Sequence, residues 1–352
     1  MKKIFLPVLM MICGTSSLAM ALTDIELSGE VDLAAQVHTL PTGVQGDSAF
    51  LVPAFLLNLN APLNQGNLMV ATFEGAEKRQ DDNTQQFDVY TRMVYLDVVS
   101  IFNGMHGLRF GLIPQTWQEA QYEDWSYRFL GKSGKVLTEK YNYLSYSDLG
   151  VSFMSELPKS WGEWAFTLVN GEGMSEETGP HKEAGIFVRM AGMSPWTLSL
   201  NYVRGSYENM NSNFNTKERI QAQVLYHPSK NWFAGVELLD AHDPAEAVRD
   251  LKMADEVDVT DVLGQSVHGR GGSIFAEVGT GPLAKVMVRY DYLDAIVGQS
   301  GKQLSSALAA LSYQVTDDIR SALAYDYTWY GDDFAPGIRD SSKIEFATQV
   351  MF

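Results

Sequence analysis

The chain has 352 residues, of which 26 are Lys or Arg and 43 are Asp or Glu, so its formal net charge is −17. This acidic balance argues against a nucleic-acid-binding protein, because recognition of phosphates requires a basic surface. The single cysteine, Cys13, lies in the leading segment described next, so the remainder of the chain cannot form disulfides or use thiolate chemistry.

The first 21 residues have the pattern of a secretory signal peptide. Lys2 and Lys3 give a positive start, Ile4–Cys13 is mostly apolar, and Ala19-Met20-Ala21 supplies the small residues of a cleavage site. The apolar run is too short for a helical membrane span, which needs about 20 residues. We therefore expect a leader over 1–21, cleaved near Ala21, and a single domain over 22–352.

The rest of the sequence is dominated by segments in which apolar and polar residues alternate. In the first of them, Leu27, Val31 and Leu33 alternate with Glu30 and Asp32, as expected of a strand with one apolar and one polar face. Each segment is close to the 9–11 residues that a tilted membrane strand requires, and there are about 16 of them. They are 26–38, 49–59, 67–77, 87–99, 105–112, 149–157, 161–169, 184–191, 197–207, 219–227, 232–240, 272–279, 285–294, 304–314, 319–329 and 343–352.

The last of these segments ends on an aromatic carboxy-terminus, Phe352, without a polar tail. Closing the sheet into a barrel would remove the unpaired edge that such a terminal strand otherwise exposes. The fold class predicted is therefore all-β, a transmembrane antiparallel β-barrel.

The connections between the predicted strands alternate strictly between short and long. The short ones are 61–66, 101–104, 158–160, 192–195, 228–231, 280–284 and 315–318. The long ones are 39–48, 78–86, 113–148, 170–183, 208–218, 241–271, 295–303 and 330–342. A soluble β-sandwich has no reason to sort its loops by end, whereas a membrane barrel has short periplasmic turns and long external loops.

The two faces of the predicted strands differ in chemistry. Aromatic residues gather on the apolar face near both strand ends, as at membrane–water interfaces: Trp164, Trp196 and Trp232 at one end, and Tyr290, Tyr292, Tyr325, Tyr327 and Trp329 at the other. The opposite face carries many charges, which a water-filled lumen would solvate and a dry core would not. A barrel of about 16 strands is wide enough for an aqueous channel.

The long connection 113–148 contains a helical pattern. Thr116 and Glu119 form a capping-box pattern, and Gly131 offers a stop after Leu130. Between them, three aromatic residues recur at helical spacing and form a face that could pack on the barrel wall: Tyr122, Trp125 and Phe129.

We expect this connection to fold inward and to narrow the pore. Three acids would face the permeant: Glu119, Glu123 and Asp124. Three arginines of the strands are the candidates for the opposite wall: Arg92, Arg109 and Arg289. Such a field across the pore would orient dipolar solutes and reject apolar ones. The alternative is an external lid whose acids face water.

Within this region the sequence resembles a known family. Gly111–Trp117, Trp125–Arg128 and Ser147–Phe153 are similar to the strand–loop–strand segment of Gram-negative porins, in particular the phosphate-selective porin O and P group and related general porins. The resemblance implies an outer-membrane barrel, usually a homotrimer, that passes small hydrophilic solutes by diffusion and needs no cofactor.

Phosphate selectivity in that group depends on a dense array of arginines and lysines in the pore. The lumen of this chain combines both signs of charge and the chain is acidic overall, so general or weakly cation-preferring permeation is the expectation. An anion-selective or phosphate-selective porin is the alternative.

Other chemistry finds less support in the sequence. The connection 241–271 contains an acidic group that could bind a divalent cation but lacks EF-hand spacing, so a solvated acidic loop is favoured: Asp255, Glu256, Asp258 and Asp261. No two histidines have helical metal-ligand spacing, which leaves a zinc site unsupported. An outer-membrane hydrolase and a structural barrel plugged by its loops remain alternative functions.

Overall fold

Sixteen antiparallel strands close into one barrel, in which each strand pairs with its neighbours in sequence and β16 pairs with β1. The computed structural model describes residues 25–40, 48–79, 85–101, 106–171, 173–174, 182–207, 215–244, 257–258, 260–262 and 265–352. The predicted all-β barrel is therefore confirmed. The predicted leader, 1–21, lies outside the described residues.

The strands follow the predicted segments closely, one for one. Their bounds are β1 Glu26–Leu40, β2 Ser48–Pro62, β3 Leu68–Arg79, β4 Gln85–Ile101, β5 His106–Pro114, β6 Ser147–Glu156, β7 Gly162–Val169, β8 Glu183–Met193, β9 Trp196–Tyr207, β10 Asn215–Ser229, β11 Trp232–Asp243, β12 Val267–Gly279, β13 Ala284–Asp294, β14 Gln303–Thr316, β15 Ile319–Tyr330 and β16 Ser341–Met351.

Short helices occupy some connections. Two α-helices, α2 (Thr116–Asp124) and α3 (Leu137–Lys140), and the 3-10 helix η3 (Arg128–Gly134) lie between β5 and β6. Among the described residues, further 3-10 helices are η2 (Asn64–Gly66), η4 (Pro158–Ser160) and η7 (Thr260–Val262). Within the described part of the chain, no helix combines the length and the apolar character needed to cross a bilayer.

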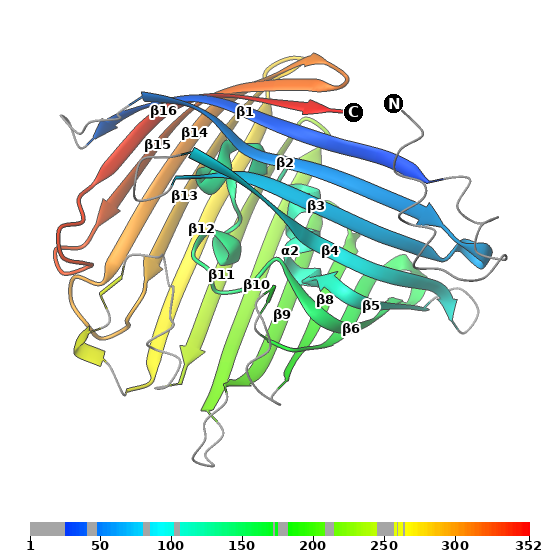
Figure 1. Ribbon diagram of the computed structural model, residues 1–352. Helices are drawn as coiled ribbons and strands as arrows, with labels where there is room; N and C mark the ends of the chain where they lie inside the picture. The colour runs from blue at the N-terminus through cyan, green and yellow to red at the C-terminus, as the bar shows by residue number, and fades with distance from the viewer. Residues whose placement is uncertain are drawn as a thin grey trace.

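The carboxy-terminus completes the closure of the barrel. Phe352 exchanges two main-chain hydrogen bonds with Gly29 of β1, of 2.9 and 3.0 Å. Farther along the same pair, Val31 lies opposite Val350 and Ala35 opposite Phe346, so apolar side chains match across the seam. No edge strand is left in the sheet, and Figure 1 shows the C-terminus beside β1.

Side chains alternate between the outside and the inside of the barrel as predicted. On three adjacent strands the outward residues Ile220, Leu238 and Ile274 are 51, 57 and 63% exposed, although they are apolar. The inward residues Gln221 and Glu237 are 0% exposed, although they are polar. Because no water-soluble protein gains from this inverted distribution, the outer surface suits an apolar surrounding.

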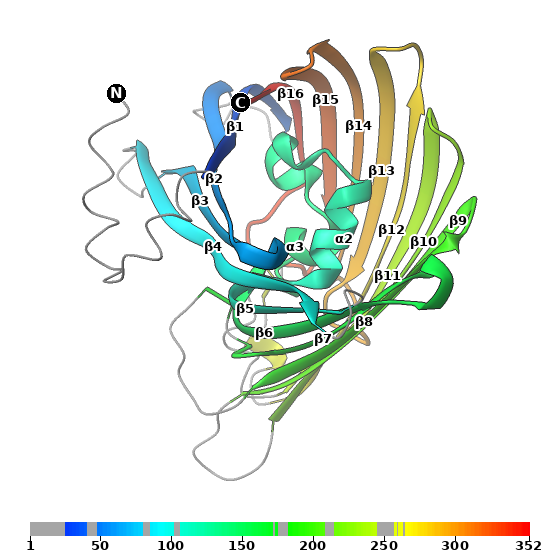
Figure 2. The same ribbon diagram turned by 90° about the vertical axis from the view of Figure 1, so that its right-hand side faces the viewer.

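The segment between β5 and β6 lies inside the barrel. Figure 2 shows α2 and α3 enclosed by the strands. The predicted single helix from Thr116 to Leu130 is wrong in its extent. The helix ends at Asp124, where the Trp125 N–H bonds the Gln121 carbonyl, and Trp125 itself is extended. Burial of the Trp125 side chain against the wall outweighs the local helical pattern.

Candidate functional site

The inward segment packs its aromatic residues on one side of the barrel. Trp125 and Phe129 are 1% exposed and share a cluster with Phe275 of β12 and Met287 of β13, and Tyr122 packs against this cluster. The Trp125 indole N–H donates to the Gly134 carbonyl at 2.7 Å. The predicted packing of these aromatic residues on the wall is confirmed.

Buried ion pairs hold the segment on the same wall. The Lys140 ammonium of α3 lies 2.7 Å from the Asp291 carboxylate of β13 and donates to the Ser306 hydroxyl at 2.5 Å. Arg289 lies 2.7 Å from another oxygen of Asp291 and 3.4 Å from Glu237. All these charged side chains are at most 5% exposed; the Lys140 pair fastens the segment to β13, and Arg289 braces Asp291 from within the wall.

The acids predicted to face the permeant are paired with two arginines of the nearer strands. Glu119 lies 2.8 Å from Arg109 of β5. Glu123 and Asp124 lie 2.5 and 2.9 Å from Arg189 of β8. Burial raises the pKa of Asp124, while Arg189 and His227 oppose that shift. These contacts attach α2 to the β5–β8 side of the barrel.

The expected arrangement, with three arginines on the wall opposite these acids, is therefore not observed. Arg109 is the ion-pair partner of Glu119 on the same side of the lumen. Arg289 is 3% exposed and lies beneath the Trp125 ring, 5.1 Å from its centroid. Arg92 lies on β4 and pairs with Glu74 of β3 at 2.5 Å. The sequence indicates which residues face inward, and it does not indicate which of them pair.

Two cavities lie between the inward segment and the strands β14 to β16 and β1 to β4. The outer cavity, of about 430 Å³, lies toward the long-loop end of the barrel. Its lining includes Glu74, Lys132, Lys135 and Lys343. The inner cavity, of about 420 Å³, lies toward the short-turn end, and its lining includes Glu30 and Arg320. Arg128 lines both cavities, so it stands at the boundary between them.

A charged network forms this boundary, and we call it the central network: Glu74, Arg92, Arg128 and Glu139. Arg128 lies 3.3 Å from Glu74 and 3.0 Å from Glu139. The Tyr122 hydroxyl donates to Glu139 at 2.5 Å, and the Arg92 guanidinium lies 3.6 Å from the centroid of the Tyr146 ring. The network thus links the inward segment to β3 and β4 across the lumen.

The electrostatics of the network favour its ionised form. Burial alone would raise the pKa of Glu139, but Arg128, Lys135 and Arg92 outweigh burial and hold that pKa below its usual value. The carboxylates raise the pKa of Arg128 despite its burial. Both side chains therefore stay charged at neutral pH.

Three of the four residues in this network were missed as site residues from the sequence. Glu74 could have been found, because it has the inward parity of β3 together with Thr72. Arg128 begins the 3-10 helix η3 and Glu139 lies in the one-turn helix α3, and both helices are too short for periodicity to mark the inward direction.

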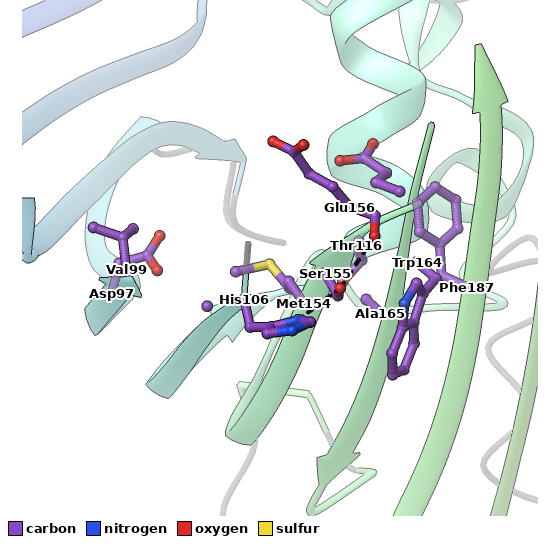
Figure 3. A pocket seen from close by; sticks show the side chains of 12 residues that line it. Asp97, Val99, His106, Thr116, Met154, Ser155, Glu156, Trp164, Ala165 and Phe187 are labelled. Atoms are coloured by element: carbon purple, nitrogen blue, oxygen red, sulfur yellow. Dashed lines mark hydrogen bonds between the residues drawn. The ribbon is translucent and has the colours of Figure 1, made fainter. Parts of the chain in front are cut away.

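A third cavity, of about 250 Å³, lies near the short-turn end of β5 to β7 (Figure 3). Its residues include a hydrogen-bonded pair, His106 Nδ1 and Ser155 Oγ, 2.7 Å apart. The neighbouring Asp97 is held by Arg109 at 3.1 Å. Ser155 lies in β6, which is paired on both sides by β5 and β7, so its strand amides serve the sheet and form no oxyanion hole.

The described residues give no support to metal chemistry. Within the described ranges no group of three or more His, Cys, Asp or Glu side chains could hold a metal ion. Two of the acids considered as a divalent-cation site, Asp255 and Glu256, lie outside the described residues.

Comparisons with known proteins identify the fold. No protein-family model and no curated protein matches the sequence. Solved structures do match. The outer-membrane channel DcaP of Acinetobacter baumannii has a TM-score of 0.64 at 10% identity, over 94% of this chain and 97% of that one. The anion-selective porin from Comamonas acidovorans has a TM-score of 0.60 at 12% identity, over 94% and 99%.

A third similar structure is OmpT, an outer membrane protein of Vibrio cholerae, in a trimer form, with a TM-score of 0.59 at 15% identity over 94% and 99%. At such identities the likeness concerns the fold alone. The chain therefore has the fold of outer-membrane porins. The narrower resemblance to the phosphate-selective O and P group is not shown by these structures.

Proposed function

We propose that this chain is a porin of the Gram-negative outer membrane, which forms a water-filled channel for passive diffusion of small hydrophilic solutes and ions. One observation carries the proposal. A closed barrel exposes apolar side chains outward and holds two charged cavities in series inside its lumen. Polar lining of this kind lets a solute exchange part of its hydration for protein groups.

The inward segment sets the constriction in this proposal. Its Arg128 pairs with Glu139 of the segment and with Glu74 of the wall, and Glu74 also pairs with Arg92. A solute that moves between the cavities therefore passes these charges. Glu119, Glu123 and Asp124 act less directly, since Glu119 pairs with Arg109, and Glu123 and Asp124 share Arg189.

Two features of the chain bear on the ion preference of the channel. The net charge of −17 favours a weak cation preference. The lining of the two lumen cavities favours the anion-selective alternative, because screening over about 8–10 Å makes nearby charges matter most. Bases outnumber acids in that lining: Arg92, Arg128, Lys132, Lys135, Lys140, Arg320 and Lys343 against Glu30, Glu74, Glu139 and Glu345.

The barrel would act in the outer membrane as an assembly of several chains. Residues 1–21 would direct export and be removed, and the barrel would insert in the outer membrane. We propose a homotrimer, in line with the sequence resemblance and with the trimer form of the similarly folded OmpT. We propose transport as the role, with hydrolysis at the hydrogen-bonded Ser155–His106 pair as the alternative, because the strand amides around Ser155 serve the sheet.

Single-channel recording of the refolded protein in a planar bilayer tests this function. Stepwise currents are expected, and the reversal potential in a KCl gradient will give the ion preference. Resistance to SDS without heating shows that the barrel is folded. A folded barrel that passes no current would instead be a plugged structural barrel. Hydrolysis of a lipid or ester that is lost in Ser155→Ala would support the enzyme alternative.

A further inference from the structure

Three neighbouring strands present a row of polar side chains to the inner cavity. Arg320 of β15, Gln349 of β16 and Glu30 of β1 all line it. The Arg320 Nη2 donates to the Gln349 Oε1 at 3.0 Å, and the Gln349 Nε2 donates to the Glu30 carboxylate at 2.8 Å. One amide therefore separates the cation from the anion.

Neither charge in this row is neutralised directly. Among the described residues, Arg320 and Glu30 have no oppositely charged side chain within 4.0 Å. The other hydrogen bonds of Arg320 go to neutral atoms, the Ser126 hydroxyl at 2.9 Å and the Ser126 carbonyl. This distinguishes Arg320 from Arg92 and Arg128, which are both paired with carboxylates.

The inward segment holds the Arg320 guanidinium in place. Its centre lies 4.4 Å from the centroid of the buried Phe129 ring, so packing fixes the plane of the donor group. A half-buried cation without a counter-charge is stabilised by an incoming anion. A half-buried carboxylate without a counter-charge is likewise stabilised by an incoming cation.

We propose that the inner cavity is a binding site for small zwitterionic solutes of the α-amino-acid class. The solute carboxylate contacts Arg320 and its ammonium group contacts Glu30. The Gln349 amide lies between these two side chains, and the two charges of an α-amino acid are about as far from each other as the two ends of that amide. The cavity of about 420 Å³ has aromatic lining from Tyr122, Trp125 and Tyr146 for an apolar side chain. This inference rests on the proposed porin function and names a solute class for it.

Three related probes separate the two charges: L-valine, N-acetyl-L-valine and L-valinamide. The first is a zwitterion, the second keeps only the carboxylate and the third keeps only the ammonium group. The experiment measures the concentration-dependent block of single-channel current by each probe. Wild-type channels are expected to be blocked by valine at about tenfold lower concentration than by either derivative, equal to about 1.4 kcal/mol.

Two variants assign the contacts. Arg320→Gln is expected to weaken the block by valine and N-acetylvaline at least about tenfold and to leave valinamide unchanged. Glu30→Gln is expected to weaken the block by valine and valinamide and to leave N-acetylvaline unchanged. Lys343→Gln removes a lumen charge of the outer cavity and serves as the matched control, with all three probes unaffected.

The outcomes are distinct from those of the porin test. Channels that conduct while valine and its derivatives block equally, or whose block is unaffected by both substitutions, would overturn the zwitterion site and leave the porin function intact. Absence of current from folded wild-type barrels would overturn the function itself. If Arg320→Gln fails to fold, Glu30→Gln alone still decides whether the ammonium group is recognised.

Discussion

The Arg128 guanidinium, on the segment folded into the lumen, lies 3.3 Å from the Glu74 carboxylate on β3. The same guanidinium lies 3.0 Å from Glu139 farther along its own segment. A single side chain thereby joins the internal loop to the barrel wall at the boundary between the two lumen cavities. The width of the channel and the position of the loop consequently depend on the same contact.

Replacing Arg128 with Gln should widen this boundary, because Gln is shorter and cannot bridge two carboxylates. We expect a higher single-channel conductance than in the wild type. The loss of folding free energy should stay below the about 3–5 kcal/mol of a fully buried pair, since Arg128 keeps some exposure. Lys132→Gln, an exposed change on the same segment, is the control. Unchanged conductance in folded Arg128→Gln channels would contradict this account of the constriction.

Substitution of the α2 acids should shift ion preference toward anions. Glu119→Gln and Glu123→Gln together remove two negative charges and leave Arg109 and Arg189 with fewer carboxylate partners. The reversal potential in a KCl gradient should therefore move in the anion direction in the double variant. Asp317→Asn, in the turn after β14, removes a charge outside the lumen lining and should have a smaller effect. An equal shift in both would mean that the α2 acids have no special position.

The barrel was predictable because its signal is local and repeated. Alternation within a strand, as in Leu27 to Leu33, depends only on the period of two, and the sorted loop lengths give the two ends. The residues that face inward follow from the same parity. Packing of Trp125 and Phe129 on the wall was predictable from their spacing.

The contacts inside the lumen were not predictable, because they join residues that are far apart in the sequence. Arg128 and Glu74 are 54 positions apart, and Arg128 lies in a segment without strand or helix periodicity. The pairing of Arg109 with Glu119 depends on where α2 lies against β5, which the sequence does not specify. The three-dimensional course of the loop, and not its composition, selects the partner of each charge.

Closure of the barrel should be sensitive to Gly29. A methyl group at this position would lie 2.7 Å from the Phe352 ring and would also meet the Leu56 carbonyl, which is backbone and cannot rotate away. Gly29→Ala should therefore destabilise the folded barrel by about 1–3 kcal/mol through overpacking. Urea unfolding in detergent or lipid measures this change. Ala35→Gly, on the same outward face of β1, is the control for a change at another position of that face. An equal loss of unfolding free energy in both variants would argue against a specific closure contact at Gly29.

The pH dependence of stability should differ in sign between two acids of the inward segment. Burial raises the pKa of Asp124 above its ordinary 3.8, so its protonation favours the folded state as pH falls toward 3.8. Glu139 is the opposite case. Its pKa lies below the ordinary 4.5, so its contribution is fully present above that pH and is lost as pH falls toward the lowered value.

Two variants isolate the contributions of these two acids to stability. Relative to Asp124→Asn, the wild type should gain stability as pH falls from neutral toward 3.8. Relative to Glu139→Gln, it should lose stability below pH 4.5, by up to about 1.4 kcal/mol for each unit of pH. Urea unfolding of the three proteins across pH gives both differences, with other titrating groups cancelling in each comparison. Differences of the same sign for the two variants would show that Arg128 and Lys135 do not hold Glu139 in its ionised form.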